Sequence, residues 1–190
     1  MDDETDFGES NEALAPSAYY IDHDLDEAPE SLRAIFDMFM QIQDDYNSQE
    51  EIALFWGLSC SRKDACEMIR RVMEPYDEMT MVICGLNAGY AVELLIDIVE
   101  GKGPNVIVAN TATFVVQLPR GVFEANHVES PGTAAALAAH KTECERIVSR
   151  LKFLGLKEKS LALLQEHKHL EISAKTMQSM LEVVGQPISK

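Results

Sequence analysis

The most apolar stretch of the sequence, residues 79–99, limits what this chain can fold into. Glu93 and Asp97 interrupt it, so no apolar run reaches the roughly 18 to 20 residues that a membrane helix needs. Of the 190 residues, 46% are hydrophobic, which is enough to bury a core without metals or disulfides. We therefore predict a mostly buried helix over residues 79–99, broken near Gly85 or Gly89, and no contact with membranes.

The negative charge is concentrated near the N-terminus. The chain has 32 acidic and 16 basic side chains, a formal net charge of -16, and residues 1–51 alone contribute -15. Residues 52–140 carry -4 and residues 141–190 carry +3. This excess opposes a general affinity for nucleic acid, so such binding needs a local basic patch. Residues 1–30 are predicted to be a flexible acidic arm, either a solubilising tail or a segment that covers a basic surface.

Residue types that carry catalysis or bind metals show no matching pattern. The four cysteines lie far apart without a Cys-x-x-Cys pair, and no cleavable apolar leader opens the chain, which predicts free thiols in the cytoplasm. The sequence contains neither a Gly-Lys-Ser/Thr phosphate loop nor a Gly-x-Ser-x-Gly elbow. We therefore predict no catalytic residue, metal or cofactor, and expect the protein not to be an enzyme.

Helical periodicity recurs along much of the chain. Apolar residues at helical spacing predict helices over residues 29–46, 62–73, 133–154, 157–169 and 173–184. The third of these has a heptad-like apolar seam, which suits contact with another helix. The seam residues are Leu137, His140, Cys144, Ile147, Leu151 and Leu154.

Residues 49–59 resemble the first half of a helix-turn-helix. Ala53 is the small residue expected where two helices cross, and Gly57 is the residue expected at the turn four positions later. Basic side chains on the next helix are then placed to meet DNA phosphates or base edges. These candidate DNA-binding residues are Arg62, Lys63, Arg70 and Arg71. The alternative is a pair of ordinary packed helices with a solvated basic face.

A second match to this motif lies near the C-terminus. Residues 170–181 resemble a turn and a recognition helix, and the alternative there is an ordinary helix capped by Ser173.

β-branched residues cluster in residues 106–116, the best strand signal in the chain, with Asn110 between its two halves. The fold class predicted is therefore mainly α: a helical bundle with a helix-turn-helix-like N-terminal unit and a small β-hairpin or strand element. The predicted segments are the arm at 1–30, the helix-turn-helix-like unit at 31–76, a buried helix plus β element at 77–126, and a helical region at 127–190.

This order of elements is similar to that of the small terminase subunits of tailed phages, over roughly residues 48–116. Members of that family assemble as rings and present viral DNA to a packaging motor. The resemblance implies a homo-oligomer that places Arg62, Lys63, Arg70 and Arg71 at the DNA.

We accordingly predict a non-catalytic, oligomeric, DNA-associated protein, a packaging or regulatory component whose weak phosphate contacts are multiplied by oligomerisation. The alternative is an acidic adaptor or assembly factor that binds protein through the 133–154 helix and does not bind nucleic acid. A third reading is a small-molecule pocket or an enzyme formed around residues 85–116.

Overall fold

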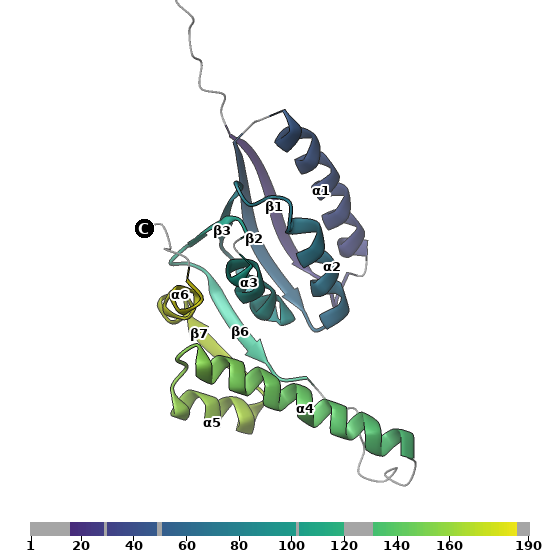
Figure 1. The fold of residues 1–190 in the computed structure, drawn as a ribbon, viewed down its shortest axis with the longest axis vertical. Helices are drawn as coiled ribbons and strands as arrows, with labels where there is room; N and C mark the ends of the chain where they lie inside the picture. Colours follow the sequence, from purple (N-terminus) through teal and green to yellow (C-terminus); the bar gives the residue numbers. More distant parts are fainter. Residues whose placement is uncertain (1–15, 29, 49–50, 102, 120–130, 186–190) are drawn as a thin grey trace, which may run out of the picture.

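The computed structural model describes residues 16–28, 30–48, 51–101, 103–119 and 131–185. Within these ranges, seven strands form one mixed sheet, accompanied by six helices (Figure 1). The strands are β1 (Ser17–Asp24), β2 (Ile52–Cys60), β3 (Thr80–Ile83), β4 (Leu86–Gly89), β5 (Asn105–Val108), β6 (Thr113–Gln117) and β7 (His169–Ser173). The helices are α1 (Glu30–Asn47), α2 (Lys63–Met73), α3 (Tyr90–Glu100), α4 (Pro131–Phe153), α5 (Glu158–His167) and α6 (Ala174–Val183).

The parallel strands follow one another across the sheet in chain order. β1 pairs with β2 along its whole length, from Ser17 beside Ile52 to Asp24 beside Ser59. The other side of β2 pairs first with β3 and, at its end, with β4. β5 then pairs with β3, and β6 pairs with β4. β3 and β4 therefore act as one interrupted strand, and β5 and β6 as a second interrupted strand beside it. β7 completes the row antiparallel to β6.

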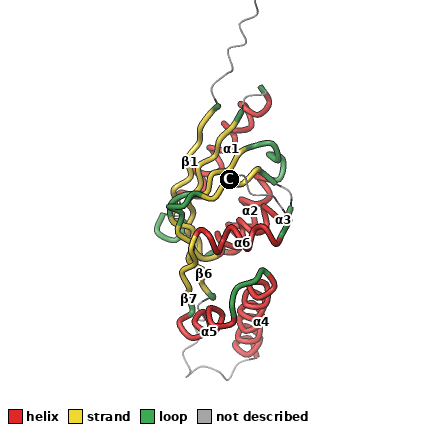
Figure 2. The backbone as a smooth tube through the Cα atoms, turned by 90° about the vertical axis from the view of Figure 1, so that its left-hand side faces the viewer, coloured by secondary structure: helices red, strands yellow, loops and turns green. Residues whose placement is uncertain are grey.

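This strand order places the connecting helices on one face of the sheet. Crossovers between parallel strands are right-handed in nearly all proteins, so strands that advance in one direction put every connecting helix on the same side. Figure 2 shows α1, α2, α3 and α6 together on one side of the strands. The core lies between these helices and side chains such as Leu54, Trp56 and Phe114, which are fully buried.

α4 and α5 pack against each other next to β7. The second half of α4 buries Ile147 and Leu151 in the core, and Leu154, which follows the helix, is buried as well. The first half of the helix extends away from the body of the protein (Figure 1). No helix in the described ranges is long and apolar enough to cross a membrane.

The predicted mainly α helical bundle is wrong, because the fold is α/β. Residues 52–60, expected to form the first part of a helix-turn-helix, are β2, and most of residues 80–89, expected to be helical, form β3 and β4. Both segments are short apolar runs, for which periodicity alone does not separate a buried strand from a buried helix. Pairing with neighbouring strands decides between the two. The described part of the chain therefore has no helix-turn-helix at residues 49–72.

Gly57 has a different role from the one predicted. It lies inside β2 rather than at a turn, opposite the junction of β3 and β4. A Cβ atom at this position would lie 3.1 Å from the carbonyl oxygen of Cys84. A side chain at Gly57 would press on the neighbouring backbone at the strand interruption, so the glycine suits this close approach and does not mark a helix turn.

Two further expectations differ from the structure. β5 and β6 confirm the strand signal at residues 106–116, but they pair with different strands and do not form a hairpin. Residues 17–24, expected within the flexible arm, form β1, whereas residues 1–15 lie outside the described residues. The single sheet also runs through all four predicted segments, since each contributes at least one strand.

The other helix predictions are confirmed within a few residues, at α1, α2, α4, α5 and α6. Ser173 caps α6 as expected, because its Oγ accepts a hydrogen bond from the backbone N–H of Thr176 at 3.2 Å.

Candidate functional site

Two of the four candidate DNA-binding residues stand at the start of α2. The guanidinium of Arg62 donates to Asp64 at 2.9 Å in an exposed pair, which holds the side chain only weakly. The ammonium of Lys63 donates to Glu143 of α4 at 2.8 Å. Lys63 therefore joins α2 to α4.

The other two candidates, Arg70 and Arg71, pair with carboxylates of their own region. Arg70 donates to Glu67 and to Glu74, at 2.9 and 2.6 Å, and Arg71 donates to Glu67 at 3.3 Å. The hydrogen bond from Arg70 lowers the pKa of Glu67 to about 2. Positive and negative groups thus alternate along α2, and a DNA phosphate would have to displace these carboxylates.

A partly buried cluster of charges fastens α4 to α3. Arg146 of α4 donates to Glu93 of α3 at 2.6 Å and to Glu143 at 2.8 Å. Hydrogen bonding from Arg146 lowers the pKa of Glu143 to about 2, whereas burial raises the pKa of Glu93. One helical turn further on, Arg150 pairs with Asp97. We call these five residues the α3–α4 clamp.

The face of the sheet opposite the helices carries apolar side chains without a covering helix in the described residues. Tyr20 of β1 is 64% exposed and stacks on Phe55 of β2, with ring centroids 4.8 Å apart. Val82 and Ile107 continue the row as half-buried side chains on the next strands. Leu86 is 47% exposed on the same face.

We call this surface the open sheet face. Its members follow from the strand register, because side chains alternate between the two faces and paired residues share one. They are Ala18, Tyr20 and Asp22 of β1; Ala53, Phe55 and Ser59 of β2; Thr80 and Val82 of β3; Leu86 of β4; Ile107 of β5; and Thr113, Val115 and Gln117 of β6.

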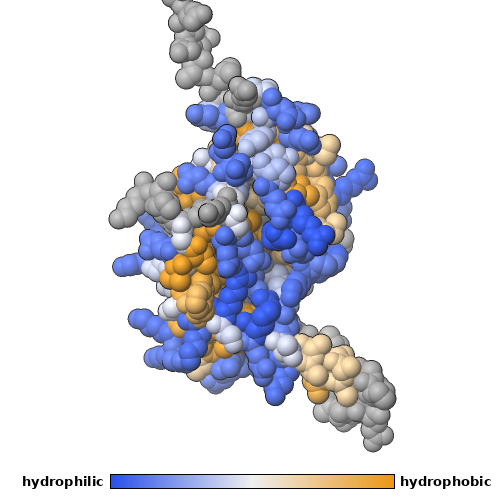
Figure 3. All heavy atoms as spheres, in the orientation of Figure 1, coloured by the Kyte–Doolittle hydropathy of each residue, from blue (hydrophilic) through white to orange (hydrophobic). Residues whose placement is uncertain are grey.

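The second apolar surface is the first half of α4. Residues 134–142 are exposed except for His140, which is half-buried, and five of them are alanines. Leu137 is 43% exposed. Alanine has the highest helix propensity, so this segment stays helical without packing against a core. Figure 3 shows the apolar colouring gathered on this projecting end. We call residues 134–142 the projecting half of α4.

A cavity of about 500 Å³ lies at the carboxyl ends of the parallel strands. Its lining residues are Asp24, Asp26, Ser59, Ser61, Gly89, Tyr90, Gln117, Leu118 and Pro119. The carboxylate of Asp26 accepts hydrogen bonds from the backbone N–H and the Oγ of Ser61, both at 2.9 Å. These bonds fix the loops that follow β1 and β2. We call this space the carboxyl-edge cavity.

Gly89 shapes the wall of this cavity, where β4 ends and α3 begins. Its φ is +65°, and a Cβ there would lie 2.4 Å from the carbonyl oxygen of Cys60 and 3.6 Å from Oε1 of Gln117. No side chain caps the first turn of α3. The Gln117 amide therefore lies close to the start of α3.

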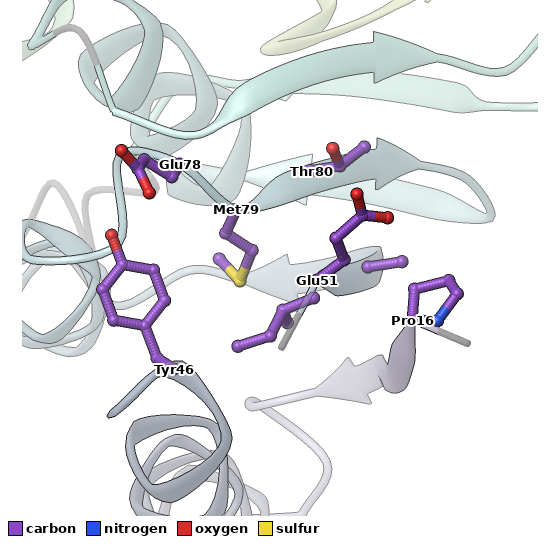
Figure 4. A pocket seen from close by; sticks show the side chains of 8 residues that line it. Pro16, Tyr46, Glu51, Glu78, Met79 and Thr80 are labelled. Atoms are coloured by element: carbon purple, nitrogen blue, oxygen red, sulfur yellow. The ribbon is translucent and has the colours of Figure 1, made fainter. Parts of the chain in front are cut away.

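A second hollow, of about 680 Å³, lies at the opposite ends of the strands (Figure 4). Its polar side chains include Glu51, Glu78 and Tyr46, whose hydroxyl donates to Asp77 at 3.2 Å. Ligands of parallel sheets bind beyond the carboxyl ends of the strands, so this hollow is the weaker candidate.

Neither a possible metal site nor a comparison with known proteins identifies the functional site further. No group of three or more His, Cys, Asp or Glu side chains in the described ranges is placed to hold a metal ion. No protein-family model matches the sequence, and comparison with curated proteins gives no significant match. The resemblance to small terminase subunits rests partly on helices that the structure assigns to strands, so it stays a prediction without structural support.

The sequence contains one signal for the α3–α4 clamp. Glu93, Asp97 and Glu100 are spaced by four and three along α3, and Arg146 and Arg150 are spaced by four along α4. Such spacings place each set on one helix face, and opposite charges predict that the two faces meet. The sequence does not predict the open sheet face, because none of β1, β2, β3 and β4 is expected to be a strand from local patterns.

Proposed function

We propose that this protein is a non-catalytic assembly component that binds protein, including further copies of itself. The observation that carries the proposal is the open sheet face: one side of the sheet exposes Tyr20 and Leu86 and leaves Phe55 half-buried, without a covering helix in the described chain. Large exposed apolar side chains on one surface, with polar residues around them, are typical of interaction sites in monomers. The projecting half of α4 is a second such surface.

The experiment is a measurement of mass in solution from about 1 to about 100 µM, a range in which weak and moderate self-association becomes visible. We expect the mean mass to rise with concentration. A mass equal to one chain at every concentration would contradict self-assembly.

Binding of a small polar molecule is a second candidate, favoured by the carboxyl-edge cavity. Its position beyond the ends of parallel strands, at a helix N-terminus, is where α/β folds bind ligands. A thermal-shift screen of polar metabolites tests it. We expect a hit to stabilise the protein and Gln117→Leu to remove the shift; a screen without any shift would contradict this candidate.

Contact with DNA stays a prediction, because all four candidate side chains have carboxylate partners but none is buried away from solvent. The absence of enzymatic activity also stays a prediction. A cytoplasmic location remains a proposal, supported by four cysteines that are free thiols.

A further inference from the structure

We infer that Cys60 and Cys66 form an oxidation site, at which a hydroperoxide converts the two thiols into a disulfide. The inference is independent of the proposed self-assembly. Cys60 ends β2 and Cys66 lies in the first turn of α2, and both are free thiols with buried side chains. Two cysteines form a disulfide readily only where the fold already holds them close together.

The carbonyl oxygen of Arg62 brings the two cysteines together. It accepts a hydrogen bond from the thiol of Cys60 at 3.3 Å and another from the backbone N–H of Cys66, also at 3.3 Å. The two thiols also hydrogen-bond to each other. The sulfur atoms are therefore neighbours, so rotation of the two side chains brings them to bonding distance.

Cys60 is the thiol that reacts first. The hydrogen bond from Cys66 lowers the pKa of the Cys60 thiol, although burial opposes this effect, and the same bond raises the pKa of Cys66. The sulfur of Cys60 also accepts the backbone N–H of Arg62, at 3.4 Å, where α2 begins. A helix N-terminus favours the thiolate, which is the nucleophilic form of cysteine. Cys60 is thus the nucleophile, and Cys66 is the thiol that resolves the intermediate.

Two hollows give a small oxidant access to the pair. Cys66 lines a hollow of about 70 Å³ between α2, α3 and α4, whose wall includes the exposed side chain of Lys63. Ser59 and Ser61, the neighbours of Cys60 in the chain, line the carboxyl-edge cavity. Because both thiols are buried, a bulky organic disulfide is too large to exchange with them. The oxidant class that fits is a small hydroperoxide.

The reaction has two steps. The thiolate of Cys60 attacks one oxygen of hydrogen peroxide and the O–O bond breaks. Cys60 becomes a sulfenic acid, and the departing hydroxide takes up the proton that Cys60 lost and leaves as water. The sulfur of Cys66 then attacks the sulfur of Cys60, and its proton goes to the departing hydroxyl, which leaves as a second water. Two thiols are thereby oxidised to one disulfide, and one peroxide is reduced to two waters.

The disulfide closes the loop 60–66, which contains Lys63. Lys63 pairs with Glu143 of α4 at 2.8 Å, and Cys66 lines the same hollow as Glu93 of α3. Oxidation therefore acts where α2 meets the α3–α4 clamp.

Peptide mapping of the full chain tests the site, because trypsin cuts between the two cysteines. Residues 34–62 then carry Cys60 as their single cysteine, and residues 64–70 carry Cys66. Native protein is treated with hydrogen peroxide, and the remaining thiols are blocked with iodoacetamide in denaturant. The two peptides should be joined, and this linkage should exceed every other cysteine pair by about tenfold or more, because disulfides form between neighbouring sulfurs.

Two variants test the roles of the thiols. Cys66→Ser should stop the reaction after the first step, so dimedone added with denaturant, which labels sulfenic acids, should mark Cys60. Absence of this label would overturn the role of Cys60 as the nucleophile. Cys84→Ser is the matched control, at a cysteine that is more exposed than either, and should leave the linkage unchanged.

The wild type alone also decides the question, whether or not the variants fold. If Cys60 and Cys66 both still react with iodoacetamide after a peroxide treatment that oxidises Cys84, the inference is wrong. A disulfide from Cys60 to Cys84 or to Cys144, in place of the one to Cys66, would equally overturn it.

Discussion

The rings of Tyr20 and Phe55 lie stacked on the open side of the sheet, with their planes 10° from parallel, while Leu54, the preceding residue of β2, is fully buried on the other side. Adjacent residues of one strand therefore face an open surface and a packed core. Substitutions at these two neighbouring positions should therefore differ in their effect on stability, which tests which face of the sheet packs against the helices.

Leu54→Ala should lower the free energy of unfolding by about 2 to 5 kcal/mol, since it leaves a cavity in the core. Phe55→Ala should cost only about 1 kcal/mol, the size of one aromatic contact. Urea denaturation at low protein concentration measures both in the monomer. Equal costs would mean that the far face is covered within a single copy.

Gly89→Ala should destabilise the protein strongly. The positive φ costs a non-glycine residue about 1 to 3 kcal/mol, and the clash with the carbonyl oxygen of Cys60 adds to it. Gly155→Ala is the control, because Gly155 also has a positive φ, of +90°, with no atom within 4 Å of the added Cβ. Thermal unfolding of both variants separates the clash from the backbone strain, and equal losses would argue against a close approach at Gly89.

The α3–α4 clamp predicts a dependence of stability on pH. The pKa of Glu143 falls from its ordinary value of 4.5 to about 2 in the folded protein, so the unfolded chain binds the proton more readily. Its contribution to stability is present above pH 4.5 and is lost as the pH falls towards 2. Glu143→Gln should therefore make the loss of stability in this range smaller.

The matched variant is Glu93→Gln, in the same cluster. Burial raises the pKa of Glu93, so its ionisation works in the opposite direction: stability is favoured in acid and lost as the pH rises through the folded pKa. Glu93→Gln should not reduce the loss between pH 4.5 and 2. Urea denaturation at a series of pH values measures both effects, and identical curves for the two variants would argue against these assignments.

Contact with DNA predicts salt-sensitive binding to duplex DNA. Arg70→Glu combined with Arg71→Glu should reduce the salt slope by about 2 if both side chains meet phosphates. Lys157→Glu with Lys159→Glu makes the same change of charge on another surface and serves as the control. The acidic arm should be shortened only to residue 15 in such tests, because residues 17–24 form β1. Binding that is absent at low salt, with and without residues 1–15, would end this prediction.

Most helices could be predicted from the sequence, whereas most strands could not. α1 and α2 have apolar residues at helical spacing, and α6 has the capping serine Ser173, so local signals suffice. β2 is a nine-residue, mostly apolar run that is buried between β1 and its other neighbours. Its conformation depends on pairing with those neighbours, and the spacing of apolar residues within the segment does not reveal that pairing.

The candidate site was harder to predict for the same reason. The sequence shows Arg62, Lys63, Arg70 and Arg71 as a basic group, but it does not show that each of them pairs with a carboxylate. Glu143 in particular is far from Lys63 in the sequence. The open sheet face depends on the order of the strands in the sheet. That order is a property of the whole fold, so no single segment of the sequence predicts it.

β1 gives the excess of acidic residues a structural meaning. Among the described strands β1 pairs with β2 alone, so its other side is an edge of the described sheet, the kind of place where a strand from another molecule can add. If two copies joined along this edge, Asp22 and Asp24 of one copy would lie next to Asp22 and Asp24 of the other. The net charge of -15 on residues 1–51 of each copy would add to this repulsion. Mutual repulsion thus protects the edge against fibril-like stacking, and neutralising those carboxylates would remove the protection.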